Sequence, residues 1–98
     1  MLVRHADRKL ERVEFEPSFR AGFGPDLVKA FRKRMQFIRD AANENDFYAL
    51  KSLHYERLKG NRSHQRSMRL NDQFRLILEL ENDPAGRVVV VVSVEDYH

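Results

Sequence analysis

Large apolar residues recur at helical spacing in the first half of the chain. Intervals of four, four and three positions separate the members of one stripe: Leu27, Phe31, Met35 and Ile38. A stripe with this period is the buried face of an amphipathic helix. Gly24-Pro25 suits the start of this helix, because proline is favoured in the first turn, and Asn43-Glu44-Asn45 ends it.

A shorter helix is predicted before it, from Arg8 to Phe15. Asp7 can cap the amide groups of its first turn, and Leu10 and Val13 lie on one face. After the long helix, Asn45 can cap a further short turn whose apolar residues are Phe47, Tyr48 and Leu50.

The second half of the chain changes to a period of two. Three strands are predicted, over Gln65–Leu70, Phe74–Leu80 and Arg87–Val94. Turn residues separate them at Asn71–Gln73 and at Asn82–Gly86. The last strand is rich in valine and does not alternate, which is typical of a central strand buried on both faces.

These elements predict an α+β fold in which two N-terminal helices pack on a small antiparallel sheet of three to four strands. The fourth strand would be Leu2–Arg4. The apolar stripe of the long helix would cover the sheet face that carries Phe74, Leu76 and Leu78. A chain of 98 residues has room for one domain, residues 1–98.

Composition narrows the possible chemistry. The chain has no cysteine, which excludes disulfides, a thiolate zinc site and a thiol nucleophile. Its longest apolar run, Val88–Val92, is too short to cross a bilayer, and its first residues lack the apolar core of a signal peptide. We therefore expect a cytoplasmic protein with no membrane association.

Positive charge is concentrated in one quarter of the chain. Residues 51–75 carry seven Lys and Arg against two acids, whereas residues 76–98 carry one Arg against five acids. Five of the seven cations are arginines, whose planar guanidinium suits phosphate. The block indicates a nucleic-acid surface, although a solvated strand face with scattered cations would have the same composition. The long helix also carries cations that are either solvated or in contact with RNA: Lys29, Arg32, Lys33 and Arg39.

Strand alternation places Arg75 on the sheet face that points away from the helices, because Phe74 and Leu76 point toward them. Arg69 and Ser67 would lie on the same outer face. If the preceding loop folds over this face, one cleft would collect the following residues: His54, Lys59, Arg69, Arg75, Asp96, Tyr97 and His98. Cations that neutralise phosphate, together with groups that move protons near neutral pH, could cleave RNA through its 2′-hydroxyl without a metal or other cofactor.

Three separated motifs carry a family resemblance: Leu53–Arg62, Gln65–Arg75 and the terminal Glu95-Asp96-Tyr97-His98. In this order they resemble the HigB toxins of the RelE/ParE superfamily of type II toxin–antitoxin systems. One departure is Phe74, where the family often has Trp or Tyr.

The resemblance implies a RelE-like fold and a ribosome-dependent endoribonuclease that cuts messenger RNA. It also implies a HigA-like antitoxin with a helix-turn-helix domain, through which alone the toxin would reach operator DNA. By motif position, the family's catalytic residues fall on His54, Lys59, Arg75, Asp96, Tyr97 and His98. Three further arginines of the basic block, Arg62, Arg66 and Arg69, are candidates for RNA binding.

The roles expected of these residues follow from their chemistry. Lys59 and Arg75 would bind the scissile phosphate. Asp96 or His98 would deprotonate the 2′-hydroxyl, the other of that pair or His54 would protonate the leaving oxygen, and Tyr97 would stack on a base. Arg69 could instead pair with Asp96 or Glu95.

Two other functions remain open from the sequence. One is a ParE-like toxin that inhibits DNA gyrase and cleaves no RNA. The other is a nucleic-acid-binding module without catalytic activity.

Overall fold

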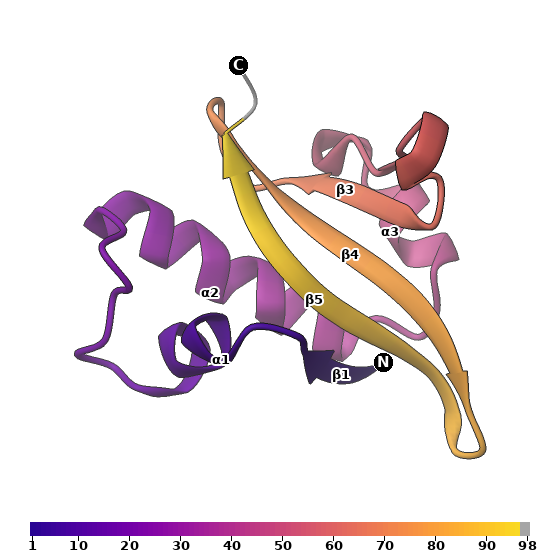
Figure 1. The fold of residues 1–98 in the computed structure, drawn as a ribbon, viewed down its shortest axis with the longest axis horizontal. Helices are drawn as coiled ribbons and strands as arrows, with labels where there is room; N and C mark the ends of the chain where they lie inside the picture. Colours follow the sequence, from indigo (N-terminus) through magenta and orange to yellow (C-terminus); the bar gives the residue numbers. More distant parts are fainter. Residues whose placement is uncertain (97–98) are drawn as a thin grey trace.

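The computed structural model describes residues 1–96, in which helices cover one face of a single sheet (Figure 1). The helices are α1 (Arg8–Phe15), α2 (Pro25–Asp40) and the short α3 (Asn45–Ala49). The strands are β1 (Leu2–His5), β2 (Glu56–Arg57), β3 (Gln65–Arg69), β4 (Phe74–Asp83) and β5 (Gly86–Asp96). Two 3₁₀ turns, η1 (Lys51–Leu53) and η2 (Gly60–Arg62), lie on either side of β2.

Both predicted helices form, and they bury the predicted faces. Asp7 caps α1 by accepting a hydrogen bond from the backbone amide of Lys9 at 2.8 Å, and Pro25 is the first residue of α2. The apolar residues of the two helices that lie in the core are Leu10, Val13, Leu27, Val28, Phe31, Met35 and Ile38. The stripe spacing therefore identified the buried face of α2 correctly.

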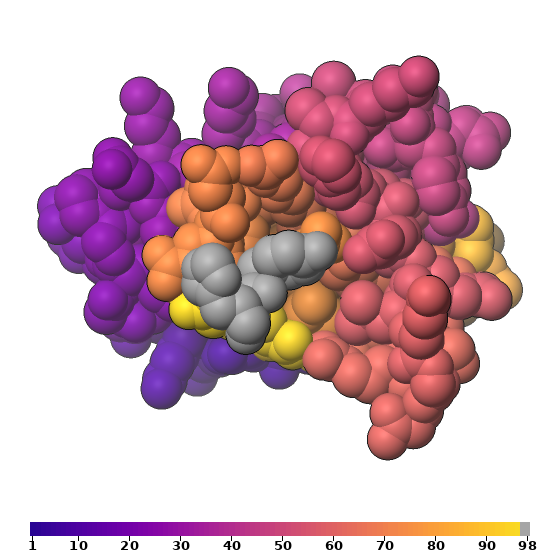
Figure 2. Space-filling model, turned by 90° about the horizontal axis from the view of Figure 1, so that it is seen from above, coloured from indigo at the N-terminus to yellow at the C-terminus, as the bar shows by residue number. Residues whose placement is uncertain are grey.

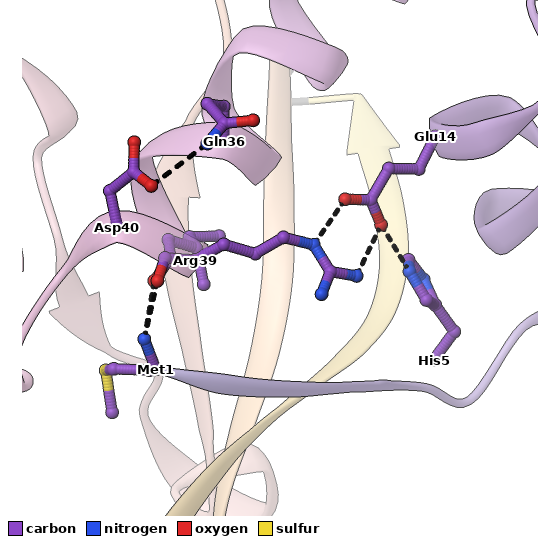
Figure 3. A network of polar contacts seen from close by, with 7 residues as sticks. Met1, His5, Glu14, Gln36, Arg39 and Asp40 are labelled. Atoms are coloured by element: carbon purple, nitrogen blue, oxygen red, sulfur yellow. Dashed lines mark hydrogen bonds and ion pairs between the residues drawn. The ribbon is translucent and has the colours of Figure 1, made fainter.

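Two of the four cations on the outer side of α2 fasten it to α1. The Arg32 guanidinium donates to the backbone carbonyl of Val13 at 2.8 Å. Arg39 forms a two-point ion pair with Glu14, at 2.6 and 3.0 Å, and the His5 ring lies 2.7 Å from the same carboxylate (Figure 3). These contacts give Arg32 and Arg39 a structural role within the molecule.

The sheet differs from the expected small antiparallel one. It has five strands in the order β1-β5-β4-β3-β2, and it is mixed because β1 runs parallel to β5. The prediction of three to four strands was wrong by the two-residue strand β2, which is too short to show a period. The short turn predicted after Asn45 forms the helix α3, which the prediction of two helices did not count.

Alternation along β4 sets the two faces of the sheet. Leu76 and Leu78 belong to the core under the helices. Ile77 is also buried, at 2 % exposure, but it lies on the opposite face and outside that cluster. On β5, Val89, Val90 and Val91 are all buried, which confirms that the valine-rich strand is covered on both faces. The long β4–β5 hairpin crosses the whole molecule (Figure 1).

A β-bulge interrupts the pairing of β4 with β5. Leu78 pairs with Val91, but Ile77 pairs with Ser93, so Val92 is an extra residue in β5. An extra residue reverses which positions face which side. Before the bulge, Val89 and Val91 face the helices; beyond it, Glu95 lies on the outer face, opposite Arg75.

Candidate functional site

Arg75 lies on the outer sheet face, as alternation predicts, near the start of β4. Its side chain is 13 % exposed, and its guanidinium donates to the hydroxyl of Ser67 at 2.8 Å and to the carboxylate of Glu56 at 3.1 Å. Ser67 is fully buried. Because β2 pairs Glu56 with Ser67, the two acceptors lie side by side and hold the Arg75 guanidinium in one orientation.

Arg69 is the direct cross-strand partner of Arg75 in the β3–β4 ladder. Two like charges directly opposite each other on one sheet face destabilise a sheet unless anions compensate them. Asp72 forms an ion pair with Arg69, and the backbone carbonyl of Asn71 accepts a further hydrogen bond from it at 3.2 Å. Two guanidinium groups are thus held next to each other by local carboxylates.

A hollow of about 270 Å³ opens beside this arginine pair. Its lining consists of His54, Arg69, Asn71, Asp72 and Arg75. His54 ends turn η1 in the left-handed backbone conformation, with φ 47° and ψ 46°. This conformation turns the chain at the point where the segment before β2 reaches the β3–β4 turn. Figure 2 views this end of the molecule, with the β3–β4 turn in orange.

A second hollow, of about 150 Å³, lies on the other side of Arg75. It is lined by Asp96 and Glu95 at the end of β5, by Arg62 from η2, and by Glu56 and Ser67. Arg75 lines both hollows, so they form one continuous surface around its guanidinium.

Glu95 is held in its charged form within this surface. Arg62 donates to both of its oxygens, at 3.1 and 2.7 Å, and Ser93 donates at 3.1 Å. The hydrogen bonds from Arg62 are the largest influence on the Glu95 carboxyl and lower its pKa. Arg69 was considered as a partner of Glu95, but the structure pairs Glu95 with Arg62. Arg69 instead forms an ion pair with Asp72.

Two of the predicted site residues lie away from these hollows. Lys59 is exposed where η2 begins and lines neither of them. Arg66 shares the helix-facing side of β3 with Met68, and its guanidinium lies 3.7 Å from Glu44. Tyr55 donates to the same carboxylate at 2.8 Å. The expectation of one cleft containing Lys59 is thus not met by the described residues, and Arg66 lies on the opposite face from Arg69.

The terminal motif is only partly described. Asp96 lines the smaller hollow and accepts a hydrogen bond from the Gln73 amide at 3.0 Å. Tyr97 and His98 lie outside the described residues, so their expected place beside Arg75 remains a prediction.

Glu56 lines the site although the sequence pattern assigned it no role, and Glu95 was considered there only as a possible partner of Arg69. To predict that Glu95 lies on the outer face, the position of the bulge must be known, because Val92 is an extra residue that reverses the alternation after it. To predict that Glu56 lies beside Ser67, the two-residue strand β2 must first be predicted. The parity of β3 alone, with Arg66 two positions from the apolar Met68, was a signal that Arg66 faces the helices.

Within residues 1–96 no group of three or more His, Asp or Glu side chains is arranged to hold a metal ion. No helix in the same range has the length and apolar character needed to cross a membrane. The chemistry that this surface offers comes from guanidinium groups, carboxylates and one imidazole.

Comparison with known proteins gives one family and one fold. A family model described as the RelE-like toxin of type II toxin–antitoxin system HigB matches residues 4–98. Among solved structures, the chain is similar to a YoeB/ParE toxin from Agrobacterium tumefaciens, with a TM-score of 0.63 and 16 % identity over 100 % of both chains. At this identity the likeness shows the fold alone. No curated protein matches the chain.

Proposed function

The chain belongs to the HigB-like family of RelE-like toxins of type II toxin–antitoxin systems, and from this premise we propose that it is a ribosome-dependent endoribonuclease that cleaves translated messenger RNA. Membership of the family implies an antitoxin partner. The observation that carries the proposal is the pairing of Arg69 directly opposite Arg75, with His54 lining the same hollow.

A phosphodiester fits this arginine pair better than a neutral ligand does. Arginine binds phosphate oxygens through two parallel N–H groups, and its charge stabilises the extra negative charge of the transition state. On binding, the phosphate would take the place of Glu56 at Arg75 and of Asp72 at Arg69. The two carboxylates, 58 % and 96 % exposed, can move into solvent at little cost.

In the proposed reaction the 2′-oxygen of the message attacks the adjacent phosphorus. Asp96 or His98 takes the 2′ proton, a new bond joins the 2′-oxygen to phosphorus, and the bond from phosphorus to the 5′-oxygen breaks. The other member of that pair, or His54, donates a proton to the 5′-oxygen. Side chains thus supply both proton transfers, and the proposed reaction uses no metal or other cofactor. Tyr97 would stack on a base, Arg62 would contact RNA from the smaller hollow, and Lys59 would do so from outside both hollows. We assign no RNA contact to Arg66, because it lies on the helix-facing side of β3 beside Glu44.

The proposal includes where the toxin acts and what neutralises it. The substrate is messenger RNA on the ribosome in the cytoplasm. The antitoxin is of the HigA-like helix-turn-helix class, and operator DNA is reached only through that antitoxin.

A purified translation system tests the activity. The wild-type chain is added to ribosomes translating a defined message, and the 5′ ends of the message are mapped. We expect new ends inside the translated region, and intact message when ribosomes are omitted, because the ribosome would present the RNA to the site. A parallel assay measures supercoiling by DNA gyrase.

The outcomes separate the three functions. Internal cuts that depend on ribosomes support the proposal. Intact message together with stalled gyrase would indicate a ParE-like toxin. Intact message and active gyrase, with salt-dependent RNA binding, would indicate a binding module.

A further inference from the structure

The side of α2 next to its buried face borders a long groove that the fold leaves uncovered. At one end, a hollow of about 490 Å³ is lined by Lys29, Lys33 and Arg34 of α2 and by Leu50 and Ser52 across from them. At the other end, a hollow of about 380 Å³ is lined by Phe37, Ala41 and again Leu50. Leu50 lines both hollows and is 40 % exposed, so the two hollows border the same side chain, and we refer to them together as the groove.

Arg34 is the unusual residue in this groove. Its Nε atom is buried and has no hydrogen-bond partner among residues 1–96. Burial lowers the pKa of its guanidinium. A buried donor of this kind costs free energy until an acceptor reaches it.

The charges of the groove are unequal along its length. At one end three cations, Lys29, Lys33 and Arg34, outnumber the single acid Asp26, whereas Asp40 and Asp46 line the other end. Apolar side chains lie between the two ends. An occupant that matches this pattern has apolar residues on one face and acids at the end that meets the three cations.

The dimensions suit a helix. The α2 residues that border the groove run from Asp26 to Ala41, and at about 1.5 Å per residue this length is about four helical turns. An RNA strand would find the apolar middle and the acidic end unfavourable, whereas an amphipathic helix satisfies all three regions.

We propose that this groove binds an amphipathic helical segment of the antitoxin, with acidic side chains facing Lys29, Lys33 and Arg34. The inference rests on the proposed function in that the partner is the antitoxin implied by the family. The groove and the hollow beside Arg75 are lined by different residues: Ser52 and Leu70 line the groove, whereas His54 and Arg69 line the hollow.

The test measures binding of the full-length antitoxin encoded beside this chain's gene, by titration calorimetry against the full chain. The double variant Lys29→Glu/Lys33→Glu replaces two cations of the groove by acids that would face the acids of the bound helix. Like charges that face each other weaken an interface. We expect affinity to fall about tenfold or more. Lys9→Glu, an exposed cation on α1 outside the groove, is the matched control and should bind as the wild type does.

A second variant tests the apolar middle. A photo-crosslinking residue is placed at position 50, and the crosslinked antitoxin peptide is identified by mass spectrometry. An acidic, amphipathic segment supports the inference. Crosslinks to ribosomal RNA alone, or unchanged antitoxin affinity in the double variant, overturn it.

Cleavage of message by the same double variant separates this inference from the proposed function. Neither lysine lines the hollows around Arg75, so we expect ribosome-dependent cleavage at the wild-type rate. If the wild-type chain cleaves no message, the nuclease proposal fails while the binding result still decides the groove.

Discussion

At the scale of single residues, Glu14 is a buried carboxylate that two side chains from other elements contact. Its side chain is 8 % exposed, and its carboxylate is hydrogen-bonded to Arg39 and to the ring of His5 (Figure 3). Burial opposes its ionisation, but the hydrogen bonds from Arg39 and His5 outweigh that effect and lower the pKa of the carboxyl below its ordinary value of 4.5. The network joins α1, α2 and β1.

We predict that Glu14→Gln lowers the free energy of unfolding by about 2 kcal/mol at pH 7, less than for a fully buried pair because Arg39 keeps partial contact with water. A depressed pKa in the folded state stabilises the protein above pH 4.5, and this contribution is lost as pH falls through the folded pKa. The difference between variant and wild type should therefore shrink below about pH 4.5. Urea unfolding at several pH values measures it.

Glu11→Gln, on the exposed side of the same helix, serves as the control for this prediction. It should change stability by less than about 0.5 kcal/mol. Equal losses in the two variants, or a difference that grows on acidification, would contradict the role given to Glu14.

At the scale of elements, the Asp7 cap makes α1 begin where it does. Asp7→Ala removes the acceptor of the Lys9 amide and should cost about 1 kcal/mol, because that amide then lacks a partner within the helix. In a domain of this size the midpoint of thermal unfolding should fall by about 4–8 °C.

Asp7→Asn keeps an acceptor oxygen in the same place, so it should restore most of the lost midpoint. Thermal unfolding followed by circular dichroism compares the three proteins. If the asparagine variant unfolds as early as the alanine variant, the charge rather than the cap would be responsible.

The same scale shows how far the sequence predicts the fold. The buried face of α2 and the two faces of β4 could be predicted because each pattern repeats several times along its element. Strand β2, with two residues, has no period to detect. The bulge at Val92 lies within a run of five valines, where no polar residue marks a change of face.

These misses determine which parts of the site were predictable. Arg75 and Arg69 could be placed, because each lies on a strand whose alternation is unbroken between it and the core. Glu95 could not, since it follows the bulge. Lys59 belongs to a loop whose course depends on tertiary contacts, and no local pattern encodes it.

At the scale of the whole molecule, the fold brings three distant segments to one end of the sheet. The η1–β2 segment supplies His54 and Glu56, the β3–β4 hairpin supplies Arg69 and Arg75, and the end of β5 supplies Glu95 and Asp96. The helices lie on the other face, so binding of RNA to this surface requires no rearrangement of the core. The groove proposed for the antitoxin borders α2 and shares no lining residue with the two hollows around Arg75.

The most direct test of this account is the single-turnover rate of message cleavage on saturating ribosomes for Arg75→Gln. Glutamine can still donate to Ser67, so the fold should be kept, but the charge at the scissile phosphate is lost. We predict a rate about 10²–10³-fold below wild type, with ribosome affinity nearly unchanged. Arg66→Gln, on the helix side of the sheet, should cleave at close to the wild-type rate. Wild-type cleavage by Arg75→Gln, or equal losses in the two variants, would contradict the central claim.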